Sequence, residues 1–120
     1  MKLAISSSGR DEDSRVEKRF GRTNWFLIVD TVTGEIKPLS NKQGYEALQG
    51  AGIQAAEMVI GEGAEAVLTG HCGPKAFRIL SAAGVTVFTG FEGPIKDALE
   101  QFKSGPMTPA PSADVEGHWL

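Results

Sequence analysis

The single cysteine and one of the two histidines stand side by side in a short turn. The turn is Gly70-His71-Cys72-Gly73, which follows the apolar residues 66–69 and precedes Pro74. A thiolate binds iron or copper, and imidazole binds iron. Proline suits the first position of a helix, and the N–H groups at a helix start favour an anion. The turn therefore predicts an anion or metal site with Cys72 and His71 as ligands, or else an ordinary loop with a half-buried thiol.

A mixed-charge segment lies earlier in the chain. Its cations are Arg10, Arg15, Lys18, Arg19 and Arg22, and its acids are Asp11, Glu12, Asp13 and Glu17. The segment predicts either a basic rim for an anionic ligand, with Arg19 and Arg22 as contacts, or a solvated loop. The whole chain has a net charge of −3, which argues against a general nucleic-acid-binding protein.

Hydrophobic periodicity predicts the elements that position these residues. Apolar and β-branched runs predict strands over residues 2–6, 25–30, 35–39, 66–69 and 85–89. Helical spacing predicts helices over residues 53–60, 75–83 and 95–102. The first three strands precede the first helix, and the second and third of them form a hairpin over residues 25–39. The last two strands then alternate with the three helices. The order predicts an α/β domain.

Right-handed crossovers then give a mixed five-stranded sheet in the order 3-2-1-4-5, with strand 2 antiparallel. Because strands 1, 3, 4 and 5 point the same way, the loop after strand 1 and all three helix starts share one edge. Strands 1 and 4 form a topological switch point there, the usual ligand crevice of an open α/β sheet. The residues expected to contact a ligand at this edge are Ser7, Ser8, Gly50, Gly52, Gly70 and Gly73.

One cysteine excludes an intrachain disulfide and a zinc site made of cysteines alone. The first residues form too short an apolar run for a signal peptide, and no later run spans a bilayer, so we expect a cytoplasmic protein with no membrane partner. Residues 1–103 are expected to form one domain and 104–120 an extended C-terminal tail rich in proline. The apolar tail end is expected to dock on the domain or to supply His118 as a metal ligand.

Several motifs, in order along residues 1–103, resemble the dinitrogenase iron-molybdenum cofactor biosynthesis family. They are Met1-Lys2-Leu3-Ala4-Ile5, Arg19-Phe20-Gly21-Arg22, Gly50-Ala51-Gly52-Ile53-Gln54-Ala55-Ala56 and Thr69-Gly70-His71-Cys72-Gly73-Pro74-Lys75-Ala76-Phe77. The resemblance implies a ribonuclease H-like three-layer α/β fold. It also implies binding or carriage of iron-molybdenum cofactor or of an iron-sulfur precursor, with cluster donor and recipient proteins as partners. His71 and Cys72 replace the asparagine and apolar residue usual in the family.

We therefore expect a protein that binds and transfers an anionic metal-sulfur cluster, and not an enzyme. A nuclease needs converging carboxylates, including one on the first strand, and residues 2–6 have none. Cys72 has no suitable base in the neighbouring sequence, because adjacent side chains diverge. The alternative is a metal-free interaction or regulatory module that binds a phosphate-containing ligand or a protein partner at the same edge.

Overall fold

The computed structural model describes residues 1–42, 50–105 and 107–113. The strands in these residues are β1 (Lys2–Ser7), β2 (Trp25–Asp30), β3 (Ile36–Ser40), β4 (Ala66–Leu68) and β5 (Thr86–Phe88). The helices are α2 (Ala51–Gly61), α3 (Pro74–Ala82) and α4 (Ile95–Lys103), together with one 3₁₀ turn, η1 (Phe20–Arg22). Each predicted strand and helix is present, with ends that differ by at most two residues. The turn η1 was not predicted.

The strands form one sheet in the order β3-β2-β1-β4-β5, as the connectivity predicts. β2 is antiparallel to both β1 and β3, whereas β1, β4 and β5 are mutually parallel. The carboxyl ends of β1 and β4 therefore lie side by side where the chain direction changes. The mixed five-stranded α/β architecture is confirmed, while the ribonuclease H-like assignment stays a prediction.

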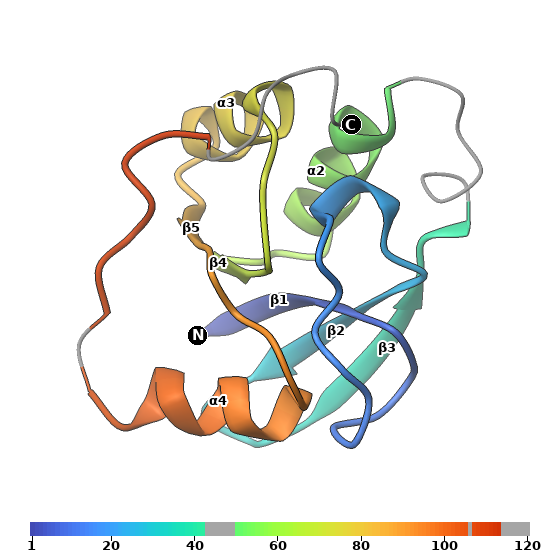
Figure 1. Ribbon diagram of the computed structural model, residues 1–120, viewed down its shortest axis with the longest axis vertical. Helices are drawn as coiled ribbons and strands as arrows, with labels where there is room; N and C mark the ends of the chain where they lie inside the picture. Colours follow the sequence, from blue (N-terminus) through green and yellow to red (C-terminus); the bar gives the residue numbers. More distant parts are fainter. Residues whose placement is uncertain (43–49, 106, 114–120) are drawn as a thin grey trace.

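The helices and the sheet form three layers (Figure 1), with one apolar cluster packed on each face of the sheet. Alternation along β1 sends Ala4 to one face of the sheet and Leu3 and Ile5 to the other. The Ala4 face is covered by α2 and α3, and the Leu3 face is covered by α4. Both faces of the central strands are buried, which is why these strands read as continuous apolar runs.

The segment between β1 and η1 runs along the carboxyl edge of the sheet and occupies the switch point. Its backbone is held by Ser6 O, which accepts from Glu17 N at 2.9 Å, and by Lys18 O, which accepts from His71 N at 2.7 Å. On the other side, Val16 N donates to Gly93 O at 2.8 Å. The mixed-charge segment thus lies over this edge, where main-chain hydrogen bonds hold it. The crevice between β1 and β4 is therefore filled by the chain itself.

After α4, the chain returns along the edge strand β5. Ala110 N donates to Val87 O at 2.8 Å, and Met107 packs on the Leu3 side of the core. Residues 107–113 hold no helix or strand, and the division into a domain of residues 1–103 and a tail of 104–120 stays a prediction. Among the helices described, none has the length and apolar character needed to cross a membrane.

Candidate functional site

The turn η1 is seated directly on the first turn of α2. A Cβ atom on Gly21 would lie 2.8 Å from both Cα and N of Gly52, so the two backbones touch with no room for a side chain. Phe20 anchors the same turn: its ring is 2% exposed and lies 5.1 Å from the ring of Phe26, centroid to centroid. Glycine at position 21 and the buried ring of Phe20 thus fix the flanking arginines beside the helix start.

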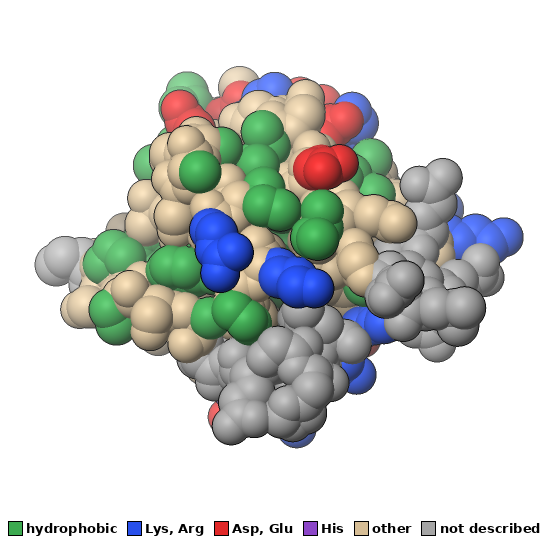
Figure 2. Space-filling view, turned by 90° about the horizontal axis from the view of Figure 1, so that it is seen from above, with side chains coloured by type: hydrophobic (Ala, Val, Ile, Leu, Met, Phe, Trp, Pro, Cys, Tyr) green, Lys and Arg blue, Asp and Glu red, His purple; other side chains and the backbone are tan. Residues whose placement is uncertain are grey.

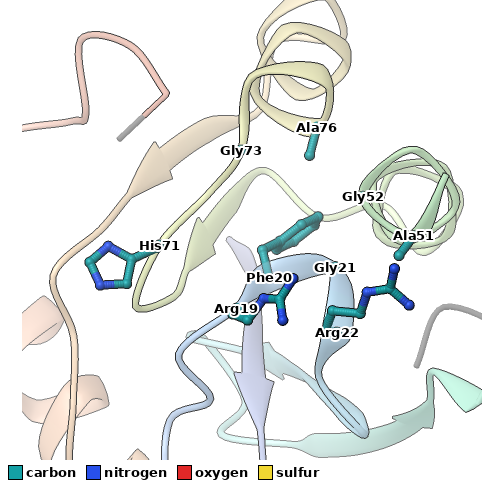
Figure 3. A pocket seen from close by; sticks show the side chains of 9 residues that line it. All are labelled: Arg19, Phe20, Gly21, Arg22, Ala51, Gly52, His71, Gly73 and Ala76. Carbon is teal, nitrogen blue, oxygen red and sulfur yellow. The ribbon is translucent and has the colours of Figure 1, made fainter. Parts of the chain in front are cut away.

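A notch opens between η1 and the starts of α2 and α3, and we call it the arginine notch (Figure 3). Its lining residues are Arg19, Phe20, Gly21, Arg22, Ala51, Gly52, His71, Gly73 and Ala76. The first turns of both helices therefore face it. Within the described residues, neither helix has a side-chain cap or an acidic residue in its first turn. N–H groups and partial positive charge converge with two guanidinium side chains, which favours an anion.

The arginine notch is small, and a larger cavity lies on the other side of His71. The notch has a volume of about 10 Å³, about that needed for one water molecule. The second cavity has a volume of about 390 Å³. We call it the glycine cleft, because glycines line three positions of its wall. Its lining residues are Arg15, Val16, Lys18, Gly70, His71, Gly90, Phe91, Glu92 and Gly93.

Charge and apolar surface are both present in the glycine cleft. Arg15 and Lys18 are exposed cations, and Glu92 is an exposed acid. Val16 and Phe91 supply apolar walls, and Phe91 is 6% exposed. The two cations outnumber the single carboxylate, so the cleft carries net positive charge. A large anion with a soft, polarisable surface suits such a lining better than a small hydrated one.

The start of α4 differs from those of α2 and α3. Its first N–H groups are already used, because Ile95 N donates to Ser14 O at 2.8 Å and Lys96 N donates to Glu12 O at 3.0 Å. An acidic residue, Asp97, also lies in its first turn. Of the three helix starts expected to share the site, that of α4 is therefore closed to a ligand, whereas residues at the starts of α2 and α3 line the arginine notch.

The two soft residues of the turn lie in different surroundings. His71 is half-buried and lines both the arginine notch and the glycine cleft, and Figure 3 shows its ring turned away from the arginine side. Cys72 is 0% exposed and belongs to the core cluster between the sheet and α2 and α3. Its Sγ lies 3.7 Å from Gly73 O. In this conformation the sulfur is presented to the core and lines neither cavity.

The serines at the end of β1 and just after it hold the basic segment and do not line the two cavities. Ser7 Oγ donates to Gly9 O at 2.8 Å, and Ser8 Oγ accepts from Arg15 N at 3.0 Å. The neighbouring Ser6 Oγ donates to Glu17 O at 2.9 Å. The hydroxyls of Ser7 and Ser8 therefore fix the path of the segment, and contact of these residues with a ligand stays a prediction.

The remaining expected residues divide between the two cavities. Arg19, Arg22, Gly52 and Gly73 line the arginine notch, and Gly70 lines the glycine cleft. Gly50 lies outside both linings and is the N-cap residue of α2. His118 lies outside the described residues. Among the residues that are described, no three His, Cys, Asp or Glu side chains gather as a metal-binding group.

Most residues that line the glycine cleft were not predicted from the sequence. Arg15 and Lys18 were visible as part of a basic rim, but their place beside Gly90, Phe91 and Gly93 depends on where the segment runs. The signal that was available is the Gly90–Gly93 turn after the last strand, since a glycine-rich turn at the carboxyl end of a parallel strand is typical of a ligand-facing loop.

Comparison with known proteins gives consistent matches. A family model described as dinitrogenase iron-molybdenum cofactor matches residues 1–105. The apo form of the orange protein (ORP) from Desulfovibrio gigas is 35% identical, with a TM-score of 0.92, and the match covers 95% of this chain and 96% of that one. A Thermotoga protein described as NifB-like and as a member of the DUF35 family is 32% identical, with a TM-score of 0.76 and coverage of 87% and 88%. The uncharacterized protein MJ0580 of Methanocaldococcus jannaschii is 28% identical over 112 residues, 89% of each chain.

Proposed function

This chain belongs to the dinitrogenase iron-molybdenum cofactor family, and on that premise we propose that it binds and carries an anionic metal-sulfur cluster as its cargo, without catalysing a reaction on it. The family and the relatives support a role in binding or biosynthesis of the iron-molybdenum cofactor. The cargo we propose is that cofactor, a precursor of it, or a related cluster of iron-sulfur or molybdenum-sulfur type. Donor and recipient proteins of the same cluster are its partners.

The observation that carries the proposal is the glycine cleft at the carboxyl edge of the sheet. Its volume of about 390 Å³ gives room for a polynuclear cluster, whereas the arginine notch has about 10 Å³. Arg15 and Lys18 supply the positive charge, and Val16 and Phe91 supply apolar contact for sulfide surfaces. Charge and surface contact thereby supply much of the binding, so that release requires few metal–ligand bonds to break.

The arginine notch adds a second, shallower anion contact beside the cleft. Arg19 and Arg22 lie there beside the starts of α2 and α3. Partial charges at a helix start contribute about 0.3–1 kcal/mol each at an exposed position, so two of them with two arginines strengthen anion binding without fixing one geometry. The notch thus extends the positive surface that an incoming cluster meets, and His71 lies between the two parts.

His71 and Cys72 are the two side chains that we propose as replaceable metal ligands. His71 is placed for this role, since it lines both cavities. Cys72 has to leave the core before its sulfur reaches a cluster, because it is 0% exposed. His118 is a third proposed ligand. The transfer of cargo is consistent with this arrangement, since one half-buried ligand together with ionic contacts exchanges faster than a closed chelate.

The test uses tetrathiomolybdate, a soluble anion with molybdenum-sulfur bonds, titrated anaerobically against the protein. Lys18→Glu reverses a charge in the cleft, and Lys103→Glu is the matched control, because Lys103 is an exposed residue at the end of α4. Reversal of one charge within about 5 Å of the anion in a partly aqueous site is worth about 1–2 kcal/mol, or roughly a 5- to 30-fold rise in Kd. The control is expected to leave Kd unchanged. Raised ionic strength is expected to weaken binding to the wild type more than to Lys18→Glu.

Two outcomes contradict the proposal. In the first, tetrathiomolybdate and a reconstituted cluster both fail to bind the wild-type protein. In the second, inorganic phosphate binds more tightly than tetrathiomolybdate and is displaced from the same residues, which supports the metal-free module in place of the carrier.

A further inference from the structure

A second surface lies outside the two cavities described above, in a groove between α3 and the last described residues. The groove is open, with a volume of about 560 Å³. Its wall on the helix side is made by Pro74, Phe77, Arg78 and Ser81, and its other wall by residues 111–113. Phe77 is half-buried, so part of its ring is available to a further apolar group.

The chain itself leads into this groove. The hydrogen bond from Ala110 N to Val87 O fixes the tail against β5, and Met107 packs on the core below it. Figure 1 shows the segment from α4 rising past β5 and ending beside α3. The described chain stops at Ala113, which already lines the groove. The seven residues that follow therefore start at its wall.

We propose that residues 114–120 dock in this groove along α3. The segment is Asp114-Val115-Glu116-Gly117-His118-Trp119-Leu120. It combines apolar side chains, including one tryptophan, with two acids and no lysine or arginine. An indole is the side chain that gains most from an open apolar groove, since it buries a large surface at small cost in conformational entropy.

Charge complements this apolar match. The sequence of α3, Pro-Lys-Ala-Phe-Arg-Ile-Leu-Ser-Ala, carries two cations and no acid. Lys75 and Arg78 are both exposed. Figure 2, which looks onto the α2–α3 side of the molecule, shows basic side chains among hydrophobic ones near the centre of this face. The two acids of the segment therefore complement the two cations of this helix.

The segment is long enough to cover the whole helix. Seven extended residues span at most about 23 Å, whereas the nine residues of α3 are about 13 Å long. The groove ends at Pro74, whose neighbours Gly73 and Ala76 line the arginine notch. Docking thus brings His118 and Trp119 within reach of the notch. That consequence for the cargo rests on the proposed function, whereas the docking itself does not.

Fluorescence of Trp119 tests the docking without any cargo. Trp25→Phe leaves Trp119 as the one tryptophan of the chain. We expect its emission to be blue-shifted and its quenching by acrylamide to be weaker than in a synthetic peptide of residues 111–120. Arg78→Glu and Ser81→Glu, each in this background, are expected to move emission and quenching to the peptide values. Lys103→Glu, on the opposite side of the sheet, is the matched control and is expected to change neither.

Hydrogen exchange of residues 114–120 in the unaltered chain gives a second readout, for the case that Trp25→Phe fails to fold. Docking predicts protection in the wild type that Arg78→Glu removes. Peptide-like emission together with unprotected amides overturns the proposal. A blue shift that disappears on dilution overturns it as well, because the occupant of the groove is then a second copy of the chain.

Discussion

Gly70→Ala tests whether the basic segment is locked to the edge of the sheet by backbone contact. A Cβ atom at position 70 would lie 2.7 Å from Lys18 O and 2.8 Å from Lys18 Cα. Ordinary contact between such atoms needs about 3.5 Å or more, so one backbone has to move. No side-chain rotation relieves the clash, since both partner atoms belong to the main chain.

The loss of stability in Gly70→Ala depends on the hydrogen bonds that this backbone movement strains. The segment is fixed near position 70 by three hydrogen bonds, from Gly70 N to Glu17 O at 3.3 Å, from His71 N to Lys18 O at 2.7 Å and from Phe20 N to His71 O at 3.1 Å. Overpacking in a closely packed site costs about 1–3 kcal/mol. For a chain of this size, each kcal/mol lowers Tm by roughly 3–6 °C, so we expect a fall of about 3–18 °C.

Thermal unfolding followed by circular dichroism measures this change. Gly61→Ala is the matched control, because Gly61 is the last residue of α2 and no atom lies within 4 Å of the added Cβ. Alanine in a helix is favoured over glycine by up to about 1 kcal/mol, so the control is expected to be neutral or slightly stabilising. Tetrathiomolybdate is expected to bind Gly70→Ala less tightly, since Lys18 moves. An unchanged Tm together with an unchanged Kd would refute the reasoning.

Three further changes separate structural from functional roles. Ser6→Ala removes the buried hydrogen-bond partner of Thr69 Oγ1, which lies 2.7 Å from Ser6 Oγ. This variant is expected to lower the free energy of unfolding in urea by about 1–3 kcal/mol, because Thr69 Oγ1 is left without that bond. The further change Thr69→Val in the same chain is expected to cost much less than Ser6→Ala alone. Cys72→Ala empties part of the core and is expected to cost about 1–2 kcal/mol; an unchanged metal content in that variant would show that the sulfur is structural. The backbone N–H groups of Val32 and Thr33 donate to the carboxylate of Asp30 and lower its pKa. Because the folded pKa lies below the unfolded one, this carboxylate stabilises the protein above about pH 4 and the gain is lost as the pH falls through the folded pKa. Asp30→Asn is therefore expected to be less stable than wild type near neutral pH and to lose less stability on acidification, as measured by urea unfolding at each pH; equal slopes for both proteins would contradict this.

The sheet was predictable from the sequence because its signals are local and its connectivity has few solutions. Residues 25–30 are aromatic and β-branched, and the observed β2 has the same bounds. Right-handed crossovers then leave one simple order for the five strands, which the structure confirms. The edge that carries the candidate site follows from this order alone.

The inner arrangement of the site was less predictable, because it depends on the path of a segment without periodicity. Ser7 and Ser8 were expected to contact a ligand, but their hydroxyls bond to the segment that follows them. The sequence places Cys72 next to His71 but does not indicate the direction of either side chain. The side chain of Cys72 points into the core, whereas that of His71 does not. The position of Lys18 beside Gly70 depends on a close approach of the two backbones, which no sequence pattern indicates.

Cluster binding at the glycine cleft is tested by anaerobic reconstitution of the apo-protein with iron, sulfide and molybdate. We expect a coloured protein that keeps molybdenum or iron in stoichiometric amount through gel filtration. A double variant, Arg15→Glu with Lys18→Glu, is expected to lose most of that metal while remaining folded. A wild-type protein that elutes colourless and free of metal contradicts cluster binding, and a double variant that retains as much metal as the wild type contradicts the cleft as its site.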